Sequence, residues 1–463
     1  MKHQNKLNAG LFSFIKPALS LIAAFMLLSL TACGGGGGGG GVADTGDGGG
    51  NGGDDAPTVD ETPFLNLTNF QTASVVIGQA NFTDNTGNQG GVDANTFSSP
   101  EGNPGVVNGI LYLPDSQNHR LLGFNSIPTA NNANADFVVG QDEFTTNSAG
   151  VGTTHLRFRF PRAVAFDGGK MFMVESENNR LLIWNSIPAG NVAADVVLGQ
   201  DDFISGGVGD CDNKGLAGPT GVSAVNGKLI AADYGNNRVL IWNSIPTTNN
   251  APADIVLGQN SFTRCRQNDD NQDGAPDIVD TIEVASARTL ADPSEVWSDG
   301  TRLVVADGLN QRVLIWNSFP TANFTPADVV LGQGDFTHRS RNDDNQDGAP
   351  DIVDTKEVAS ARTLGAFNTE VYSNGQQLFV ADTHNNRVLV WNSFPTENFT
   401  PADVVLGQGD FTHKTRNDLD QDGTDDGQAS AQTLHAPSGL FQSGNQLIVT
   451  DTGNHRYLIF NGQ

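Results

Sequence analysis

Two short segments recur six times along the 463-residue chain, always in alternating order. The first reads acid-x-x-Asn-x-Arg-x-Leu. The second has three apolar residues followed by Gly-Gln-x-x-Phe, with its Gly at 78, 140, 199, 258, 332 and 407. Repetition of this kind indicates a chain built from copies of one structural unit, each of which buries its apolar surface against the next.

Each unit contains short apolar runs separated by turn residues. In the third unit these runs are 221–225, 228–232, 238–242 and 254–257. Such runs predict β-strands, and four strands per unit predict propeller blades. The chain begins with an isolated fourth-strand copy at 74–79 and ends after a third strand at 456–460, so the two ends should complete one blade. We therefore expect an all-β fold over residues 62–463, a six-bladed β-propeller of four-stranded blades.

The repeated polar residues are interpreted as structural. The Asn suits a turn that needs a left-handed backbone, and the acid and Arg on either side of it are spaced to pair. Six near-identical copies are what a folding requirement produces, although a ring of arginines that binds an anionic ligand is an alternative. The set comprises Asp115, Asn118, Arg120, Glu175, Asn178, Arg180, Asp233, Asn236, Arg238, Asp307, Asn310, Arg312, Asp382, Asn385, Arg387, Asp451, Asn454 and Arg456.

The acid-x-x-Asn-x-Arg turn is preceded by Pro-x-Gly-Val at 219–222 and by Pro-Ser-Gly-Leu at 437–440. With these residues the unit resembles the NHL repeat. The resemblance covers about residues 62–463 and implies a six-bladed β-propeller. The units that begin near Phe160, Leu290 and Leu364 have lost parts of Pro-x-Gly-Val, so the resemblance leaves the blade edges open.

The N-terminal 33 residues resemble a bacterial lipoprotein signal. Three lysines precede an apolar run at 18–30 that is too short to span a bilayer, and Leu-Thr-Ala-Cys at 30–33 resembles the lipobox. We expect a signal peptide at 1–32, lipidation of Cys33, and a flexible Gly/Asp-rich tether at 33–61. Gly rather than Asp follows Cys33, which by the same resemblance favours an outer-membrane lipoprotein in the cell envelope, facing the periplasm or the surface.

Three connections between a fourth strand and the next first strand carry related acidic insertions. We name them the first (269–280), second (343–354) and third (418–426) acidic loops. Oxygen-bearing side chains at alternate positions, followed by a Gly that allows a sharp turn, are typical of a loop that wraps a calcium ion. The candidate ligands are Asp269, Asn271, Asp273, Asp277, Asp280, Asp343, Asn345, Asp347, Asp351, Asp354, Asp418, Asp420, Asp422 and Asp426.

No helical pattern flanks these loops, which resemble the thrombospondin type 3 style of calcium loop. A solvated acidic loop built from turn formers is the alternative. Unneutralised, the clustered carboxylates would repel one another, which favours calcium as a structural cofactor. The third loop has Ala429 at its twelfth position and should bind more weakly.

Cys211 and Cys265 lie in equivalent connections of neighbouring units. Because an exported protein meets an oxidising compartment, we expect them to form a disulfide. The net charge of −27, from 52 acidic and 25 basic residues, excludes a nucleic-acid partner, which needs a basic face.

The chain lacks nucleophile-elbow, zincin, C-x-x-C and P-loop motifs. In a propeller, the acidic loops and the acid-x-x-Asn-x-Arg turns share one face. We predict a monomeric, lipid-anchored binding module, rather than an enzyme, that presents this face to a protein or glycan. The alternative is a metal-dependent hydrolase or lyase with its site at the propeller channel, to which His338 and His413 would add metal ligands. A structural envelope protein is a third possibility.

Overall fold

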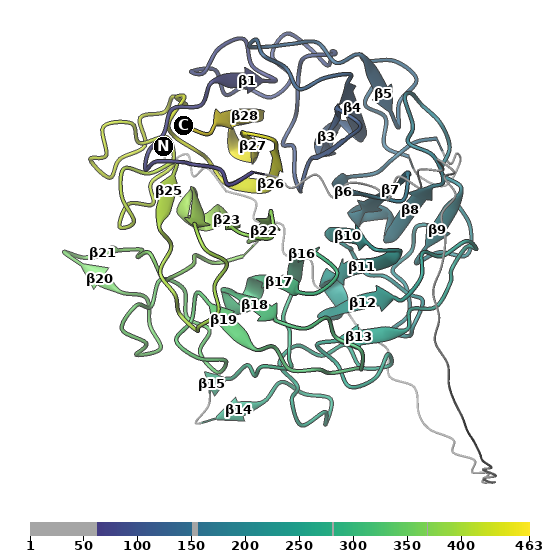
Figure 1. Ribbon diagram of the computed structural model, residues 1–463, viewed down its shortest axis with the longest axis vertical. Coiled ribbons are helices and arrows are strands. Elements are labelled where there is room, and N and C mark those ends of the chain that lie inside the picture. Colours follow the sequence, from purple (N-terminus) through teal and green to yellow (C-terminus); the bar gives the residue numbers. More distant parts are fainter. Residues whose placement is uncertain (1–62, 151–155, 280–281, 368) are drawn as a thin grey trace, which may run out of the picture. The chain divides into compact units, whose positions relative to one another are not determined.

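The computed structural model describes residues 63–150, 156–279, 282–367 and 369–463. Cys33, the expected signal peptide, the whole of the expected tether and Asp280 lie outside the described residues. The described chain forms six four-stranded antiparallel sheets arranged in a ring (Figure 1), which confirms the predicted six-bladed β-propeller. Among these residues, no helix is both long and apolar enough to cross a membrane.

We number the blades in chain order. Blade one comprises β2 (Gly105–Val107), β3 (Ile110–Asp115), β4 (Arg120–Phe124) and β5 (Phe137–Val139). Blade two comprises β6 (Pro161–Asp167), β7 (Lys170–Glu175), β8 (Arg180–Trp184) and β9 (Val196–Leu198). Blade three comprises β10 (Gly221–Val225), β11 (Lys228–Asp233), β12 (Arg238–Trp242) and β13 (Ile255–Leu257).

The second half of the ring continues in the same way. Blade four comprises β16 (Pro293–Ser298), β17 (Leu303–Asp307), β18 (Arg312–Trp316) and β19 (Val329–Leu331). Blade five comprises β22 (Glu370–Ser373), β23 (Leu378–Asp382), β24 (Arg387–Trp391) and β25 (Val404–Leu406). Blade six comprises β26 (Pro437–Ser443), β27 (Gln446–Asp451), β28 (Arg456–Asn461) and β1 (Val75–Ile77).

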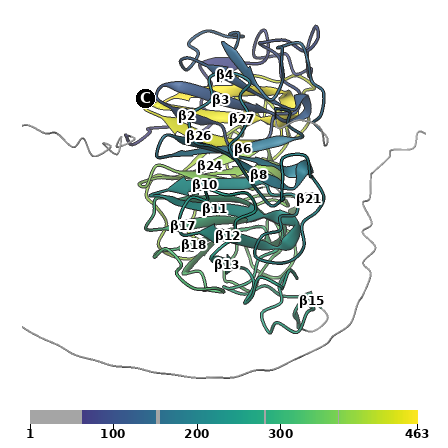
Figure 2. The same cartoon turned by 90° about the vertical axis from the view of Figure 1, so that its right-hand side faces the viewer.

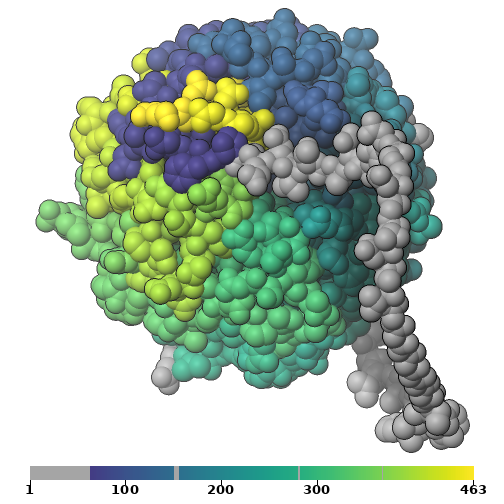
Figure 3. All heavy atoms as spheres, viewed as in Figure 1, coloured from purple at the N-terminus to yellow at the C-terminus, as the bar shows by residue number. Residues whose placement is uncertain are grey.

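Blade six is completed by the N-terminal strand, as the order of the motifs predicts. β1 pairs antiparallel with β28, with Val76 opposite Leu458. Nη1 of Arg456 also donates to the carbonyl of Phe82 (2.5 Å). Figure 3 shows N-terminal and C-terminal segments, purple and yellow, side by side at this seam. Closure leaves the ring without an open end.

Tryptophans fill the space between neighbouring blades. Trp184, Trp242, Trp316 and Trp391 end the third strands of blades two to five and are 1–2% exposed. Trp242 of blade three packs in one cluster with Phe172 of blade two, and its indole N–H donates to the carbonyl of Ala251 (3.0 Å). Truncation of such a side chain costs about 3–5 kcal/mol, so these rings contribute strongly to blade packing.

One arginine joins the two recurring segments in every blade. In blade three, Nε of Arg238 donates to Oδ2 of Asp233 (2.7 Å), and Nη1 donates to the carbonyl of Phe262 (2.7 Å), the Phe of Gly-Gln-x-x-Phe. Asn236 also donates to Asp233 (2.9 Å), and the next residue, Asn237, has a φ of 54°. All six acids and all six arginines are buried, so each guanidinium is held within its own blade.

The Asn of each acid-x-x-Asn-x-Arg turn ends a single turn of 3₁₀ helix between the second and third strands. These turns are η1 (Ser116–Asn118), η2 (Ser176–Asn178), η3 (Tyr234–Asn236), η4 (Gly308–Asn310), η5 (Thr383–Asn385) and η6 (Thr452–Asn454). The six turns lie on the same face of the ring as the connections from fourth to first strands.

Two small hairpins lie outside the blades and extend the first and second acidic loops. They are β14 (Ile278–Val279) with β15 (Ile282–Glu283), and β20 (Ile352–Val353) with β21 (Lys356–Glu357). The sequence predicts loop at these positions, and the structure instead forms two short hairpins. Asp354 and Thr355 have φ values of 47° and 69°, as a two-residue type I′ hairpin turn requires, so Asp354 is a turn residue at a hairpin tip.

The first described residues lie on the opposite face from the acidic loops. The carbonyl of Pro63 accepts from Nε2 of Gln442 (2.7 Å), and the N–H of Leu65 donates to Oε1 of Gln377 (2.7 Å). Both glutamines lie next to turns between first and second strands. Figure 2 shows the C-terminus at one face of the ring and β15 and β21 at the other.

Candidate functional site

Each acidic loop rests on the 3₁₀ turn of the blade that follows it. Asn268, just before the first loop, exchanges two amide hydrogen bonds of 2.9 Å with Asn310. Asn342 pairs in the same way with Asn385 (3.0 and 2.8 Å). The asparagines of the repeated turns therefore fix the position of the loops on this face.

In the first acidic loop, a buried carboxylate organises the backbone. Oδ1 and Oδ2 of Asp269 accept from the N–H groups of Asp273 and Gly274 (both 2.9 Å). Oδ2 of Asp277 accepts from the N–H of Asp270 (2.8 Å), and its Oδ1 accepts from the side chain of Asn271. Asp269, Asn271 and Asp277 thus belong to one hydrogen-bonded loop. Asp273 contributes by accepting from the N–H two residues ahead.

The second acidic loop repeats this arrangement. Asp343 accepts from the N–H groups of Asp347 (3.0 Å) and Gly348 (2.9 Å), and Asp351 accepts from the side chain of Asn345 (2.7 Å). Asp354 lies three residues beyond Asp351 along an extended strand, about 10 Å further on. The structure therefore brings four of the five candidates of this loop together and leaves Asp354 outside the group.

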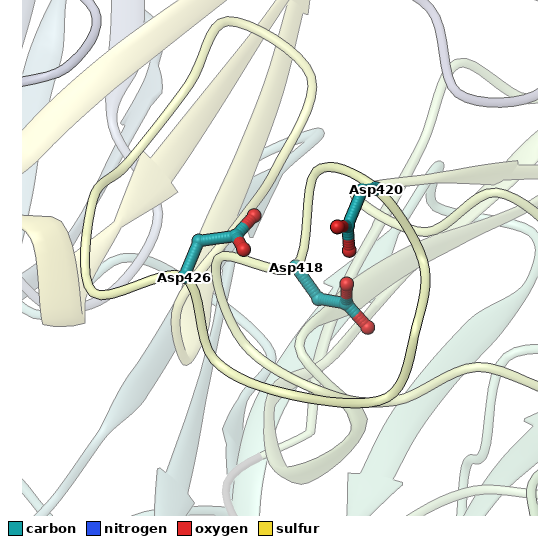
Figure 4. A group of neighbouring side chains, drawn as sticks. All are labelled: Asp418, Asp420 and Asp426. Carbon is teal, nitrogen blue, oxygen red and sulfur yellow. The ribbon is translucent and has the colours of Figure 1, made fainter.

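The third acidic loop gathers three carboxylates. Oxygen atoms of Asp418, Asp420 and Asp426 all lie within 4.8 Å of one another (Figure 4), and Asp418 is buried while the other two are exposed. Asp422 accepts from the N–H of Thr424 (2.7 Å). Asp420 replaces the Asn of the other two loops, so this loop, for which we expected the weakest binding, holds the highest density of negative charge.

The charges in the third loop affect one another. The N–H of Asp422 donates to Asp420 and lowers the pKa of its carboxyl group. Partial desolvation and the negative charges of Asp422, Asp426 and Asp418 outweigh that hydrogen bond, and the pKa of Asp420 is raised overall. A cation among these oxygens would remove this repulsion.

His338 and His413, which the alternative function would use as metal ligands, pair locally. Nδ1 of His338 lies 2.8 Å from Oδ1 of Asp335, and Nδ1 of His413 lies 2.8 Å from Oδ1 of Asp410. Although partial burial opposes ionisation, hydrogen bonds from Thr337 and His338 lower the pKa of Asp335 to about 2. Across the described ranges, the third acidic loop holds the one group of three carboxylate, His or Cys side chains close enough to share a metal.

A second charged group, which sequence reasoning missed, lies on the ring axis. We name Glu101, Arg162, Glu295 and Glu370 the axial cluster. An Nη2 atom of Arg162 lies 2.8 Å from Oε2 of Glu101 and 3.8 Å from Oε1 of Glu370. Glu295 and Glu370 are 0% and 1% exposed. The cluster joins blades one, two, four and five where the first strands of the ring converge.

Burial favours the neutral form of the two central carboxyl groups of the axial cluster. Burial raises the pKa of Glu295 to about 8, although Arg162 and the N–H of Val296 favour ionisation. Burial, followed by the charge of Glu295, raises the pKa of Glu370 well above its usual range. Oε2 of each residue is buried and has no hydrogen-bond partner unless one of the two carries a proton. The pair therefore holds a proton at neutral pH.

A sequence signal for this cluster was present in the altered repeats. Gly221 of Pro-x-Gly-Val pairs with Ala232, and Glu295 and Glu370 occupy the same register opposite Ala306 and Ala381. Arg162 stands at the variable position of the same element in blade two. Thus the three units that depart from Pro-x-Gly-Val supply three of the four axial residues. A Cβ at Gly221 would clash with the Glu295 carboxylate, so the retained Gly makes room for it.

Cys211 and Cys265 form the predicted disulfide, with Cα atoms 6.2 Å apart. They link the connection after β9 to the connection after β13. The bond therefore ties neighbouring blades together beside the first acidic loop.

No family model matches the chain, and no curated protein matches it. Solved structures that resemble it include the computationally designed Ika8 protein (8% identity, TM-score 0.36, 84% of this chain and 100% of that chain). They also include an auxiliary nutrient binding protein from Bacteroides thetaiotaomicron VPI-5482 (10%, 0.42, 85% and 76%) and streptogramin B lyase (8%, 0.38, 83% and 96%). Likenesses this remote carry no functional argument. The fold itself defines the class: a six-bladed β-propeller with an acidic face and a charged axis.

Proposed function

We propose that the protein is a lipid-anchored, extracytoplasmic binding module that presents a calcium-stabilised acidic face to a protein or glycan. The observation that carries the proposal is the placement of two features on opposite faces. The acidic loops occupy one face, and the chain enters the propeller at Pro63 on the other. With Cys33 lipidated, the acidic face would be directed away from the point of attachment and toward a partner.

Calcium is supported by the type and arrangement of the oxygens. Calcium takes six to eight oxygen ligands from carboxylates, amide carbonyls and water in a flexible geometry. Each acidic loop bends around a buried Asp and a Gly with positive φ, and exposes further carboxylates beside them. In the third loop the oxygens of three carboxylates lie within 4.8 Å of one another. Asp269, Asp343 and Asp418 would hold the ion together with the acids and asparagines that follow.

Thermal unfolding with and without calcium tests the cofactor. We expect calcium to raise the melting temperature, because an ion that binds only the folded state stabilises it by mass action. The triple variant D269N/D343N/D418N should lose this response. D425N is the matched control, since Asp425 lies in the third loop but pairs with Arg416 (2.6 Å). An unchanged melting temperature in saturating calcium would contradict the cofactor assignment.

Binding to glycan arrays and to purified envelope proteins tests the partner. The wild type should retain a ligand in calcium and release it on chelation, and the triple variant should not bind. Binding that is equal in calcium and in chelator would place the partner elsewhere on the propeller. Membrane fractionation of the wild type and of C33A tests the anchor separately, because C33A should move to the soluble fraction while its folded body keeps the calcium response.

A further inference from the structure

A pocket of about 200 Å³ lies on the propeller axis and touches the first strand of every blade. We name it the axial pocket. Its lining residues come mainly from the second halves of the first strands, so the pocket lies toward the face opposite the acidic loops. Four aromatic side chains line it, and each is only partly buried, so solvent reaches their rings: Phe166, Trp297, Tyr372 and Phe441.

One register position of the first strands explains why the axis is hollow at this level. Blades one to three have small residues at this position, and blades four to six have aromatic residues: Gly105, Ala165, Ser223, Trp297, Tyr372 and Phe441. A Cβ at Gly105 would clash with the ring of Phe166, so that ring fills the space beside the glycine. The other five residues line the pocket. The pocket therefore has a small side, at Ala165 and Ser223, and an aromatic side.

The lining offers a ligand no charge. None of the lining residues in the described part of the chain is ionised at neutral pH. Burial raises the pKa of Tyr372 above its ordinary value, and its hydroxyl donates to the carbonyl of Gln442 (3.3 Å). A charged ligand would lose its hydration here without meeting a counter-charge, which is costly. The axial pocket therefore selects neutral ligands.

Most polar groups of the lining are already satisfied. Nδ2 of Asn103 donates to the carbonyl of Val371 (3.2 Å), and its Oδ1 accepts from the N–H of Leu440 (2.7 Å). Oγ of Ser298 donates to a backbone carbonyl (2.6 Å). The hydroxyl of Ser223 makes no hydrogen bond within the ranges that the structure describes. A ligand with many hydroxyl groups, such as a sugar, would leave most of them unpaired, whereas a single hydroxyl has a partner in Ser223.

We propose that the axial pocket binds a neutral, single-ring aromatic molecule with one hydroxyl group, a phenol, with its ring against the aromatic side and its hydroxyl bonded to Ser223. An apolar cavity of roughly 150 Å³ holds one benzene ring, so this pocket has room for one ring and its hydroxyl. Aromatic rings gain more from edge-to-face or offset packing than from burial alone, and a saturated ring lacks this gain. Tyr372 and Phe441 already pack in a tilted pair with centroids 5.2 Å apart. The site is separate from the acidic loops and does not depend on calcium.

The probe is phenol, titrated calorimetrically at pH 7 into the full-length protein, with cyclohexanol and benzoate as matched controls. We expect one phenol to bind saturably per chain. Cyclohexanol has a similar size and the same hydroxyl but no aromatic ring, and should bind about fivefold more weakly or less. Benzoate is charged and should not bind. Equal binding of cyclohexanol, saturable binding of benzoate, or no binding of phenol would overturn the proposal.

Two further titrations separate this site from other sources of the same chemistry. N-acetyltyrosinamide carries the phenol ring on a peptide unit, and tighter binding of this compound than of phenol would overturn the assignment to a free molecule. Calcium chelation should leave phenol binding unchanged, so that failure of the calcium proposal and failure of this one are distinguishable.

Variants of the lining locate the site. S223A should lower phenol affinity about fivefold and leave benzene affinity unchanged, because only phenol can use the hydroxyl. S244A, at an exposed serine after β12, is the matched control and should leave both affinities unchanged. A165F puts a ring into the small side and should abolish binding of both compounds. Far-ultraviolet circular dichroism and melting temperature verify folding.

If A165F fails to fold, F441L replaces it, because that substitution removes one ring of the aromatic side and keeps an apolar side chain. F441L should weaken the binding of phenol and of benzene alike. Wild-type phenol affinity in S223A would refute the role of the hydroxyl. Wild-type affinity in folded A165F, or in F441L, would refute the location.

Discussion

Arg162 on β6 reaches to within 3.8 Å of Glu370 on β22, although these strands belong to blades two and five. In a ring of six, the third neighbour stands directly across the axis. The contact therefore spans the centre of the propeller rather than a seam between adjacent blades. It places a guanidinium and a carboxyl pair that shares a proton where the first strands converge.

Stability should fall as pH rises through the range in which the axial pair ionises. The pKa of Glu295 is about 8 in the folded protein and near 4.5 in an unfolded chain, so between these values the folded state holds more protons. The contribution of this carboxyl group to the free energy of unfolding is then fully present below about pH 4.5. It is lost toward pH 8, at up to about 1.4 kcal/mol per pH unit for each proton. Asp292, with its pKa raised to about 6 by burial, acts in the same direction. Chemical denaturation of the wild type and of E295Q/E370Q measures the difference, and parallel pH profiles would contradict it.

Replacing Asp420 with Asn should affect the apo and calcium-loaded proteins in opposite ways. Asn is the residue that the first and second loops carry at this position, so D420N introduces no foreign side chain. We expect the apo protein to melt at the same temperature or slightly higher, because repulsion around Asp420 is relieved. The calcium-induced rise should shrink. Differential scanning calorimetry checks both signs, with D425N as the charge-matched control; a larger calcium response in D420N would count against the third loop as a site.

Loss of the Cys211–Cys265 disulfide should destabilise the propeller by about 4 kcal/mol on the chain-entropy estimate for the 54 residues it spans. The C211S/C265S variant should unfold at lower denaturant with a larger m-value, because its unfolded chain is less compact. Titration of thiols in the denatured, unreduced wild type should find neither cysteine free. Two reactive thiols would refute the pairing.

The D233N substitution should cost about 3–5 kcal/mol, because it leaves the buried guanidinium of Arg238 without its counter-charge. The exposed pair of Arg416 with Asp425 offers the comparison, since such pairs contribute about 0–1 kcal/mol. Urea unfolding of D233N and D425N measures both costs. Similar small losses in the two variants would show that the repeated acid is not required for blade stability.

Removal of the closing strand should abolish cooperative folding. A chain that begins at residue 83 lacks β1 and the Phe82 carbonyl that Arg456 contacts, so β28 becomes an open edge. A chain that begins at residue 60 keeps the seam and is the matched control. We expect a single sharp calorimetric transition for the control and none for the shorter chain. An unchanged melting temperature in the shorter chain would sink the closure argument.

Much of the fold could be predicted because its determinants are local and repeated. The Arg238–Asp233 pair and the Trp242 position are visible as spacing within one unit, and six copies remove the ambiguity of any single one. The hairpin at 352–357 was missed because strands of two residues are too short to show a periodic pattern. The sequence predicts Asp354 as a ligand from its position in a loop; the structure places it, with a positive φ, in a hairpin turn that the sequence pattern did not indicate.

The axial cluster could not be predicted because comparison of the six repeats shows the residues that they have in common. The cluster residues stand at positions where the repeats differ. Arg162, Glu295 and Glu370 each occur once at an altered Pro-x-Gly-Val element. Their meeting depends on which blades stand opposite each other, which is a property of the closed ring. The loss of Pro-x-Gly-Val in three units is visible in the sequence. The charged residues that stand there instead were the sequence signal that pointed to the cluster.

The seam of blade six also has a mechanical consequence. Tension applied through the residues that precede Pro63 enters the propeller where Leu65 and Asn66 contact Gln377 and Gln463, beside β1 and β28. The load therefore falls first on blade five, through Gln377, and on blade six, the one blade whose strands come from both ends of the chain. The other four blades bear force only after these contacts have opened.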